Sequence, residues 1–343
     1  MRVAAVLVVV AIAGLAACDR AAAPAPAAVA VSDQRLAMGS LLRLTAWTRD
    51  PDRARLAFAE VFAEFDRLDG LLSVWREGSD VQRVNAAAGR APVVVHEDTR
   101  RVLAAARHTS EATDGAFDIT FGALADVWKF DHDQDGRVPA ASAIAARLPL
   151  VDYRQVHVAD GPGTAFIARA GMRIHLGGIG KGYAVDRAVA KLRAAGLHDF
   201  LIQSGGDLYV AGRNGDRPWH LGIQDPRGEA DTVFATLDLT DATLSTSGDY
   251  ERVFVRDGVR YHHLIDPRVG QPARGCRSVT IVSRTATEAD GLSTGVFILG
   301  PERGLALVER LPDVEAVIVT ADNRVLISSG LTGRVHVERP PTP

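Results

Sequence analysis

Cysteine is nearly absent from this sequence, because its 343 residues include only Cys18 and Cys276. Two cysteines permit at most one disulfide and exclude a zinc site built from cysteine ligands. Long basic runs are also lacking, and the formal net charge is −3. Nucleic-acid binding depends on dense positive charge, so we expect no nucleic-acid partner. The remaining composition, 47% hydrophobic and 24% charged, is ordinary for a soluble globular protein.

The apolar stretch at the N-terminus is too short for a comfortable membrane-spanning helix. It covers residues 3–14, whereas a spanning helix needs about 20 apolar residues. Arg2 precedes it, and Leu-Ala-Ala-Cys follows, ending at Cys18. This is the lipobox pattern at which bacterial lipoproteins are cut and acylated, so we predict a signal peptide over residues 1–17 and a lipid on Cys18. A plain secretory signal that is cut before Cys18 is the alternative.

Lipidation would place the protein in the bacterial cell envelope, anchored to the membrane and facing the periplasm. Asp19 after the cysteine favours the inner membrane. Cys276 would then stand alone, without a partner for an internal disulfide. Residues 18–32, rich in alanine and proline, are typical of a flexible tether. We expect the folded domain over residues 33–337 and a short tail over residues 338–343.

A glycine-rich stretch in the middle of the chain predicts an anion-binding loop. Residues 172–176 have the pattern of an apolar strand, and four glycines and Lys181 follow within residues 177–182. A helix with apolar spacing then runs toward Gly196. Strand, glycine loop and helix N-terminus together offer free backbone N–H groups and partial positive charge to a phosphate. Neither the Walker nor the dinucleotide-binding pattern fits, and a tight turn that binds nothing is the alternative.

The rest of the chain mixes helical and strand periodicity. A long amphipathic helix is predicted from an apolar stripe, and a second helix is predicted over residues 99–108. The stripe consists of Leu56, Phe58, Val61, Phe62, Phe65, Leu68 and Leu72. Beyond Phe200, short strands alternate with glycine turns at spacings that suit antiparallel neighbours. These strands are predicted at residues 200–203, 208–211, 219–223, 233–239 and 252–255.

Several polar residues are candidates for chemistry, each with a simpler alternative. Asp290 and Thr294 are four apart near the start of a predicted helix, so they share a face and could hold a hard cation, although Asp290 could instead be an N-cap. His263 could be a base or ligand, or only a hydrogen-bonded histidine. Trp75 could stack on a planar ligand or lie in the core. The acidic stretch at residues 131–136 lacks the twelfth-position glutamate of a calcium loop and predicts an acidic surface loop.

Taken in order, these segments make the sequence similar to the ApbE family of FAD:protein FMN transferases. The match includes Asp-Gly-Ala-Phe-Asp-Ile-Thr at residues 114–120 and Leu-Gly-Gly-Ile-Gly-Lys-Gly-Tyr-Ala-Val-Asp at residues 176–186. Each segment is weak alone, but eight in sequence are specific, and the resemblance extends over nearly all of residues 34–328. The other six lie at residues 38–40, 79–85, 205–207, 246–250, 263–270 and 289–294. Family members are often bacterial lipoproteins, which agrees with Cys18.

The resemblance implies an α+β fold, with a single domain around a T-fold-like core of largely antiparallel sheet packed by helices. It implies a transferase that splits the pyrophosphate of its substrate FAD, joins FMN to a threonine of an acceptor redox protein and releases AMP. It further implies Mg²⁺, or Mn²⁺ in its place, held by Asp290, Thr294 and the carbonyl of Gly178. His263 is the residue expected to take the threonine proton. Residues implied in binding the flavin, adenine or diphosphate are Met38, Trp75, Ala116, Phe117, Asp118, Lys181 and His263.

The sequence departs from the family pattern at a few positions. His175 stands where aspartate is common, Gly180 where alanine is common, and Trp75 where many members carry tyrosine. Two other functions remain open at this stage. An FAD pyrophosphatase would use water in place of threonine, and a non-catalytic lipoprotein would only bind flavin.

Overall fold

The computed structural model describes residues 27–229 and 231–343 of the chain. The predicted signal peptide, the lipidation site Cys18 and most of the predicted tether lie outside the described residues. Strand β1 begins at Val29, so the ordered fold starts within the segment that the sequence assigned to the tether. In the part of the chain that is described, no helix has both the length and the apolar character needed to cross a membrane.

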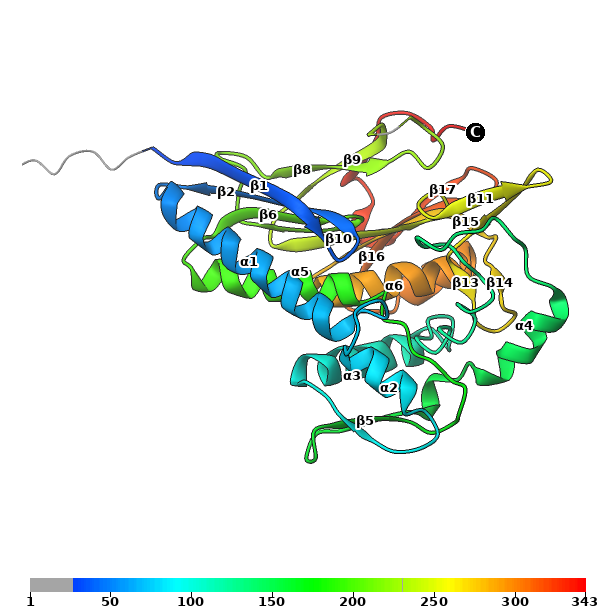
Figure 1. The fold of residues 1–343 in the computed structure, drawn as a ribbon. Helices are drawn as coiled ribbons and strands as arrows, with labels where there is room; N and C mark the ends of the chain where they lie inside the picture. Colours follow the sequence, from blue (N-terminus) through cyan, green and yellow to red (C-terminus); the bar gives the residue numbers. More distant parts are fainter. Residues whose placement is uncertain (1–26, 230) are drawn as a thin grey trace, which may run out of the picture.

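An eight-stranded antiparallel sheet forms the centre of the molecule (Figure 1). Its strands, in spatial order, are β1 (Val29–Ala37), β2 (Ser40–Thr48), β6 (Asp199–Ser204), β7 (Asp207–Ala211), β10 (Ala242–Gly248), β15 (Cys276–Ser283), β16 (Glu315–Thr320) and β17 (Val325–Ile327). Spatial and chain order differ because segments far apart in the sequence supply neighbouring strands. This arrangement brings distant loops to the same end of the sheet.

Smaller sheets surround this centre. They are β8 (Trp219–Gln224) with β9 (Val233–Leu239) and β18 (Val335–Val337); β3 (Val93–Val94) with β5 (Thr164–Ile167) and β4 (Val156–Ala159); β11 (Val253–Arg256) with β12 (Val259–His262); and β13 (Ile265–Asp266) with β14 (Gln271–Pro272). The predicted strands from Phe200 onward are therefore confirmed, with ends shifted by one residue at most. The turn between β11 and β12 holds Asp257 and Gly258 at φ 51° and 74°, as the Asp-Gly pair predicts.

Seven helices are present among the described residues: α1 (Pro51–Leu72), α2 (Asp80–Ala86), α3 (Glu97–Ala112), α4 (Ala141–Arg147), α5 (Gly180–Ala194), α6 (Ala286–Leu299) and α7 (Pro301–Val308). Short 3₁₀ turns are η1 (Leu148–Leu150), η2 (Tyr153–Gln155) and η3 (Ser329–Leu331). Local signals explain their starts. The Asp50 side chain accepts from the Arg53 amide ahead of Pro51 in α1, and the Ser79 side chain caps α2 by accepting from the Gln82 amide.

The central sheet lies between two layers (Figure 1). Helices α1, α5 and α6 cover one face of the central sheet, and the sheet of β8, β9 and β18 covers the other (Figure 1). On the helical side, Phe58 and Phe65 of α1 belong to one buried cluster with Phe200 of β6. On the opposite side, Trp219 and Phe234 lie in a second cluster. This arrangement confirms the predicted α+β class.

Two local predictions were wrong. Leu56 was placed in the buried stripe of α1 but is 70% exposed, because it is rotated about 200° around the helix from Phe58. Residues 172–176 were expected to form a strand, yet only one bridge, from Phe121 to Arg173, occurs there. The segment is extended but does not join a sheet, because its amides at Ile174 and His175 are taken by Asn85 and Ile119.

Candidate active site

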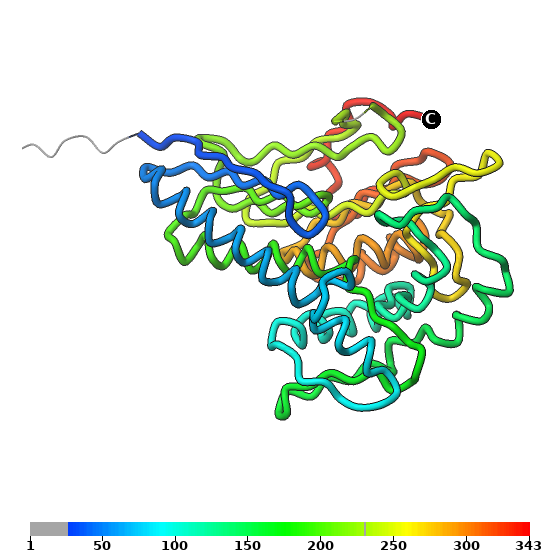
Figure 2. The backbone as a smooth tube through the Cα atoms, viewed as in Figure 1, coloured from blue at the N-terminus to red at the C-terminus, as the bar shows by residue number. Residues whose placement is uncertain are grey.

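A cleft of about 1340 Å³, including its open mouth, lies where the distant loops converge. Its walls come from the residues after α3, the glycine loop, the β6–β7 turn, the end of β10, the segment around His263 and helix α6. Figure 2 shows α5, in green, meeting α6, in orange, and these two helices bring Lys181, Asp290 and Thr294 to the cleft. Eight of the predicted site residues line it: Ala116, Phe117, Asp118, Gly178, Lys181, His263, Asp290 and Thr294.

The glycine loop can approach α6 closely because it lacks side chains. A Cβ added at Gly178 would lie 3.3 Å from the Phe117 ring and 3.4 Å from Thr294 Oγ1. At Gly182, in the first turn of α5, a Cβ would lie 2.2 Å from the carbonyl oxygen of Ala286. A Cβ fits tightly at the Gly178 distances but not at 2.2 Å, so the crossing of α5 and α6 requires glycine at position 182.

Lys181 lies between two buried carboxylates. Its Nζ is 2.8 Å from Asp207 Oδ2 and 3.8 Å from Asp290 Oδ1. Burial alone would lower the pKa of this ammonium, but the two carboxylates outweigh burial and hold its pKa above the ordinary range. Burial and the nearby Asp207 charge raise the pKa of Asp290. The Gly182 amide donates to Asp290 Oδ2 at 2.9 Å, which fixes the carboxylate.

Hydroxyl groups from β10 support Thr294. Ser247 Oγ lies 3.2 Å from Thr294 Oγ1 and 2.8 Å from Ser293 Oγ. Asp290 and Thr294 are one turn apart in α6, so both face the cleft as the spacing predicted. A carboxylate, a hydroxyl and the nearby Gly178 backbone are hard oxygen donors, which is the chemistry that Mg²⁺ or Mn²⁺ prefers. Across the described chain, no group of three or more His, Cys, Asp and Glu side chains gathers to hold a metal.

His263 lies on the cleft wall beside the base of the β11–β12 hairpin. Its backbone amide donates to the Arg252 carbonyl at 3.1 Å. Within the described residues, its Nδ1 has no hydrogen-bond partner. Burial, together with the positive charge of Arg252, lowers the pKa of the imidazole to about 3. The ring is therefore neutral at physiological pH and can accept a proton.

The segment at residues 116–118 forms an apolar wall. Ala116 and Phe117 are buried. The Asp118 carboxylate accepts from the Thr120 amide and hydroxyl at 2.7 and 2.6 Å, and from the Tyr153 amide at 2.9 Å. Burial nevertheless raises the pKa of Asp118. These hydrogen bonds tie Asp118 to Thr120 and Tyr153, so we infer that Asp118 shapes this wall.

Met38 and Trp75 are not among the residues that line the cleft, so their role in binding stays a prediction. Met38 forms the β1–β2 turn with φ 47°, and its methyl group lies 4.0 Å from the Cβ position of Gly180. Trp75 is 53% exposed and meets His132 edge-on, with ring centroids 4.3 Å apart. His175 does line the cleft, and its Nδ1 accepts from the Gly177 amide at 3.0 Å.

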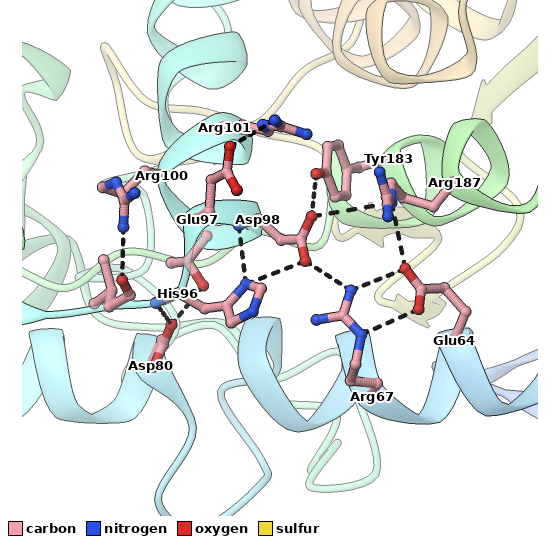
Figure 3. Close-up of polar contacts among 12 residues, drawn as sticks. Glu64, Arg67, Asp80, His96, Glu97, Asp98, Arg100, Arg101, Tyr183 and Arg187 are labelled. Atoms are coloured by element: carbon pink, nitrogen blue, oxygen red, sulfur yellow. Dashed lines mark hydrogen bonds and ion pairs between the residues drawn. The ribbon is translucent and has the colours of Figure 1, made fainter. Parts of the chain in front are cut away.

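A charged network behind the cleft holds α5 against α1 and α3 (Figure 3). Arg67 of α1 bridges Glu64 Oε1 at 2.8 Å and Asp98 Oδ2 at 2.6 Å, while Tyr183 of α5 donates to Asp98 Oδ1. Arg187, one turn further along α5, reaches Glu64 Oε1 at 3.3 Å. Hydrogen bonds from Arg67 hold the pKa of Glu64 below its usual range. These contacts therefore hold the first turns of α5, which carry Lys181, against α1 and α3.

Sequence reasoning missed several cleft residues. Asp207, the partner of Lys181, entered only as part of the segment at residues 205–207, and Ser247 only as part of the segment at residues 246–250. Residues 132, 134 and 135 of the predicted acidic surface loop are exposed, whereas Asp131 at its start lines the cleft and pairs with Arg252. The signal for Asp207 was an acidic residue at the start of an apolar strand, where a buried charge needs a partner.

The fold and cleft define a class of α+β proteins in which a glycine loop and its lysine face a carboxylate–hydroxyl pair across a deep pocket. The sequence model of the ApbE family matches residues 38–318. The chain belongs to the ApbE family.

Relatives agree in sequence and in structure. A protein of Treponema pallidum (strain Nichols) named FAD:protein FMN transferase is 37% identical over 322 residues, covering 89% of each chain. A solved ApbE protein from Thermotoga maritima has a TM-score of 0.82 at 33% identity, covering 89% of this chain and 99% of that one. The flavin transferase ApbE from Vibrio cholerae has a TM-score of 0.81 at 26% identity, covering 90% and 99%.

Proposed function

We propose that this chain is an FAD:protein FMN transferase, which joins FMN through its phosphate to a threonine hydroxyl of an acceptor redox protein and releases AMP. One observation carries the proposal: the glycine loop with Lys181 and the Asp290–Thr294 face of α6 meet across a single cleft. This arrangement offers positive charge and oxygen donors to a diphosphate, which is the part of FAD that must be cleaved. The curated relatives named FAD:protein FMN transferase support this reading.

The reaction needs one bond made and one broken. The threonine oxygen attacks the phosphorus on the FMN side of the diphosphate, a new phosphoester bond forms, and the bridging oxygen leaves with AMP. The neutral ring of His263 accepts the threonine proton, and the phosphate oxygen of the departing AMP takes up a proton. Lys181 keeps its charge beside the diphosphate, because Asp207 and Asp290 hold its pKa high.

Asp290, Thr294 and the carbonyl of Gly178 fit Mg²⁺, with Mn²⁺ as the alternative, and they are the residues that would hold it. When bound, the cation neutralises charge on the diphosphate. The low pKa of free His263 makes it a weak base, but a polyanionic substrate opposes the effect of Arg252 and raises that pKa. The chain itself therefore supplies the base, the ammonium and the oxygen donors.

The cellular location is part of the proposal. The lipobox ending at Cys18 supports a lipid anchor in the bacterial envelope, with the catalytic domain in the periplasm and the inner membrane favoured by Asp19. A Cys18→Ser variant is expected to move from the membrane fraction to the soluble periplasmic fraction. Retention of that variant in the membrane would remove the lipid anchor from the proposal.

The test is a mass measurement on an acceptor. The full chain in detergent is mixed with FAD, Mg²⁺ and a candidate acceptor redox subunit, and the expected result is FMN attached to a threonine. Asp290→Asn should abolish transfer, and His263→Ala should slow it about 10²-fold or more. Asp238→Asn, an exposed carboxylate of β9, is the control and should transfer at the wild-type rate.

The same assay separates the other two functions. FMN and AMP formed without acceptor modification would indicate a pyrophosphatase. Tight stoichiometric FAD binding with no AMP release would indicate a flavin-binding protein and would overturn the proposed transfer.

A further inference from the structure

Helix α6 has no side-chain cap of its own. Its N-cap residue is Thr285, whose side chain makes no capping hydrogen bond. The cap comes from another helix, one hundred residues earlier in the chain. Asp186 of α5 accepts from the Ala286 amide at 2.8 Å through Oδ1 and from the Thr287 amide at 2.9 Å through Oδ2. The Thr287 hydroxyl also donates to Asp186 Oδ2.

The hydrogen bonds of this cap are charge-assisted, because a carboxylate lies at the positive end of a helix. The first amides of a helix have no partner within it, and they favour negative charge. Asp186 satisfies two of these amides with its two oxygens, so its contact is bidentate. The geometry constrains where the first turn of α6 lies relative to α5.

The same two helix turns make a second contact nearer the cleft. Gly182 lies one turn before Asp186 in α5, and Asp290 lies one turn after Ala286 in α6. The Gly182 amide donates to Asp290 Oδ2 at 2.9 Å. Two residues of α5, Gly182 and Asp186, therefore hold three residues of α6, which are Ala286, Thr287 and Asp290. The contact made by Asp186 is the one further from the cleft, and Asp186 is not among the residues that line it.

We propose that Asp186 is a positioning residue, which fixes the register of α6 against α5 and so the separation between the Gly178–Lys181 wall and the Asp290–Thr294 wall. This inference rests on the proposed cation site for its functional consequence. A shift of α6 along α5 would move Asp290 away from both the Gly182 amide and the glycine loop. Groups that hydrogen-bond directly to a ligand typically change metal affinity by about 10–100-fold when removed. Asp186 acts one contact further out, through the Gly182–Asp290 bond, so we expect an effect at the lower end of that range.

The test uses the full chain without FAD and two readouts. Asp186→Asn is nearly the same size but places an NH₂ group against one backbone amide. Its expected effects are faster hydrogen exchange at the Gly182 amide and about 10-fold weaker binding of Mn²⁺, measured by electron paramagnetic resonance. Glu288→Gln is the matched control, since Glu288 lies in the same first turn and, among the described residues, makes no hydrogen bond to α5. It should leave both readouts unchanged.

The readouts separate positioning from simple stability. If Asp186→Asn lowers the melting temperature but keeps wild-type Gly182 exchange and Mn²⁺ affinity, the proposal is overturned. Equal effects from Glu288→Gln would also overturn it, since the cause would then be charge at the helix end. If the wild-type chain binds no Mn²⁺, the cation assignment of the proposed function fails, while Gly182 exchange still decides the positioning claim.

A milder variant covers the case in which Asp186→Asn does not fold. Thr287→Val removes only the side-chain donor to the same carboxylate and keeps both backbone contacts. It should raise Gly182 exchange several-fold. Unchanged exchange in a folded Thr287→Val chain would overturn the proposal in that case.

Discussion

The neutral state of His263 has a consequence for stability that can be measured without substrate. Burial, with the charge of Arg252, lowers its pKa from the ordinary 6.5 to about 3. In the unfolded chain the ring would take up a proton as the pH falls below its ordinary value, while in the folded chain it would not. The unfolded state then binds more protons, so folding stability falls as the pH falls from about 6.5 toward about 3.

The size of this effect follows from the two pKa values. Between about pH 7.5 and about pH 5, the His263 contribution to the free energy of unfolding should drop by about 2 kcal/mol. This is an upper value, because the ring borders the cleft and water there relaxes part of the burial penalty. Glu64, whose pKa is lowered, titrates below this window and does not contribute to the change.

The assay is urea denaturation of wild type and His263→Gln at both pH values. The variant loses the titrating ring but keeps a polar side chain of similar reach. The difference in unfolding free energy between the two proteins should therefore shift by up to about 2 kcal/mol in favour of the variant at the lower pH. Other titrating groups are common to both proteins and cancel. His108→Gln, on the exposed side of α3, is the control and should follow wild type.

Parallel behaviour of wild type and His263→Gln across this range would refute the argument. It would mean that the ring is protonated in the folded protein as readily as in the unfolded one. A ring with the ordinary pKa of 6.5 is still largely neutral at pH 7.5 and can take the threonine proton, so this result would refute the burial argument and not the role of His263 as the base.

Three further predictions concern packing, acid stability and the cation. Gly182→Ala should destabilise the fold by at least about 1–3 kcal/mol, seen as a lower melting temperature, since its Cβ would lie 2.2 Å from the Ala286 oxygen. Gly180→Ala should be tolerated, because its added Cβ would lie 3.9 Å from the nearest atom, in Leu72. An equal drop in melting temperature for both variants would contradict the argument from close approach. Glu64 has a pKa lowered by Arg67, so it stabilises the fold above its ordinary value of 4.5, and that stability is lost as the pH falls through the lowered pKa. Glu64→Gln should flatten the acid side of the stability curve in denaturation experiments, and an unchanged acid slope would exclude this role. Chelation of divalent ions should stop FMN transfer reversibly while circular dichroism stays constant, because Lys181 remains paired with Asp207; chelation without loss of transfer would exclude the cation.

Short-range features of this fold could be predicted from the sequence. Ser79 caps α2, the Asp257-Gly258 pair makes a hairpin turn, and Gly196 ends α5 with φ 75°. Each depends on one or two residues and their neighbours, which is why a local pattern suffices. The four-residue spacing of Asp290 and Thr294 likewise placed them on one face of α6.

Tertiary structure decided what those residues meet. Lys181 and Asp207 pair across the cleft, Asp186 caps a helix one hundred residues away, and Trp75 lies outside the cleft lining. No periodicity encodes these arrangements, because they depend on how separate elements pack, and the approach of α5 to α6 in particular is allowed by Gly182. The sequence by itself determined the chemical groups and the elements that carry them. Only the packing of those elements determined which charges face one another, because a buried charge is stable only where the fold brings it a partner.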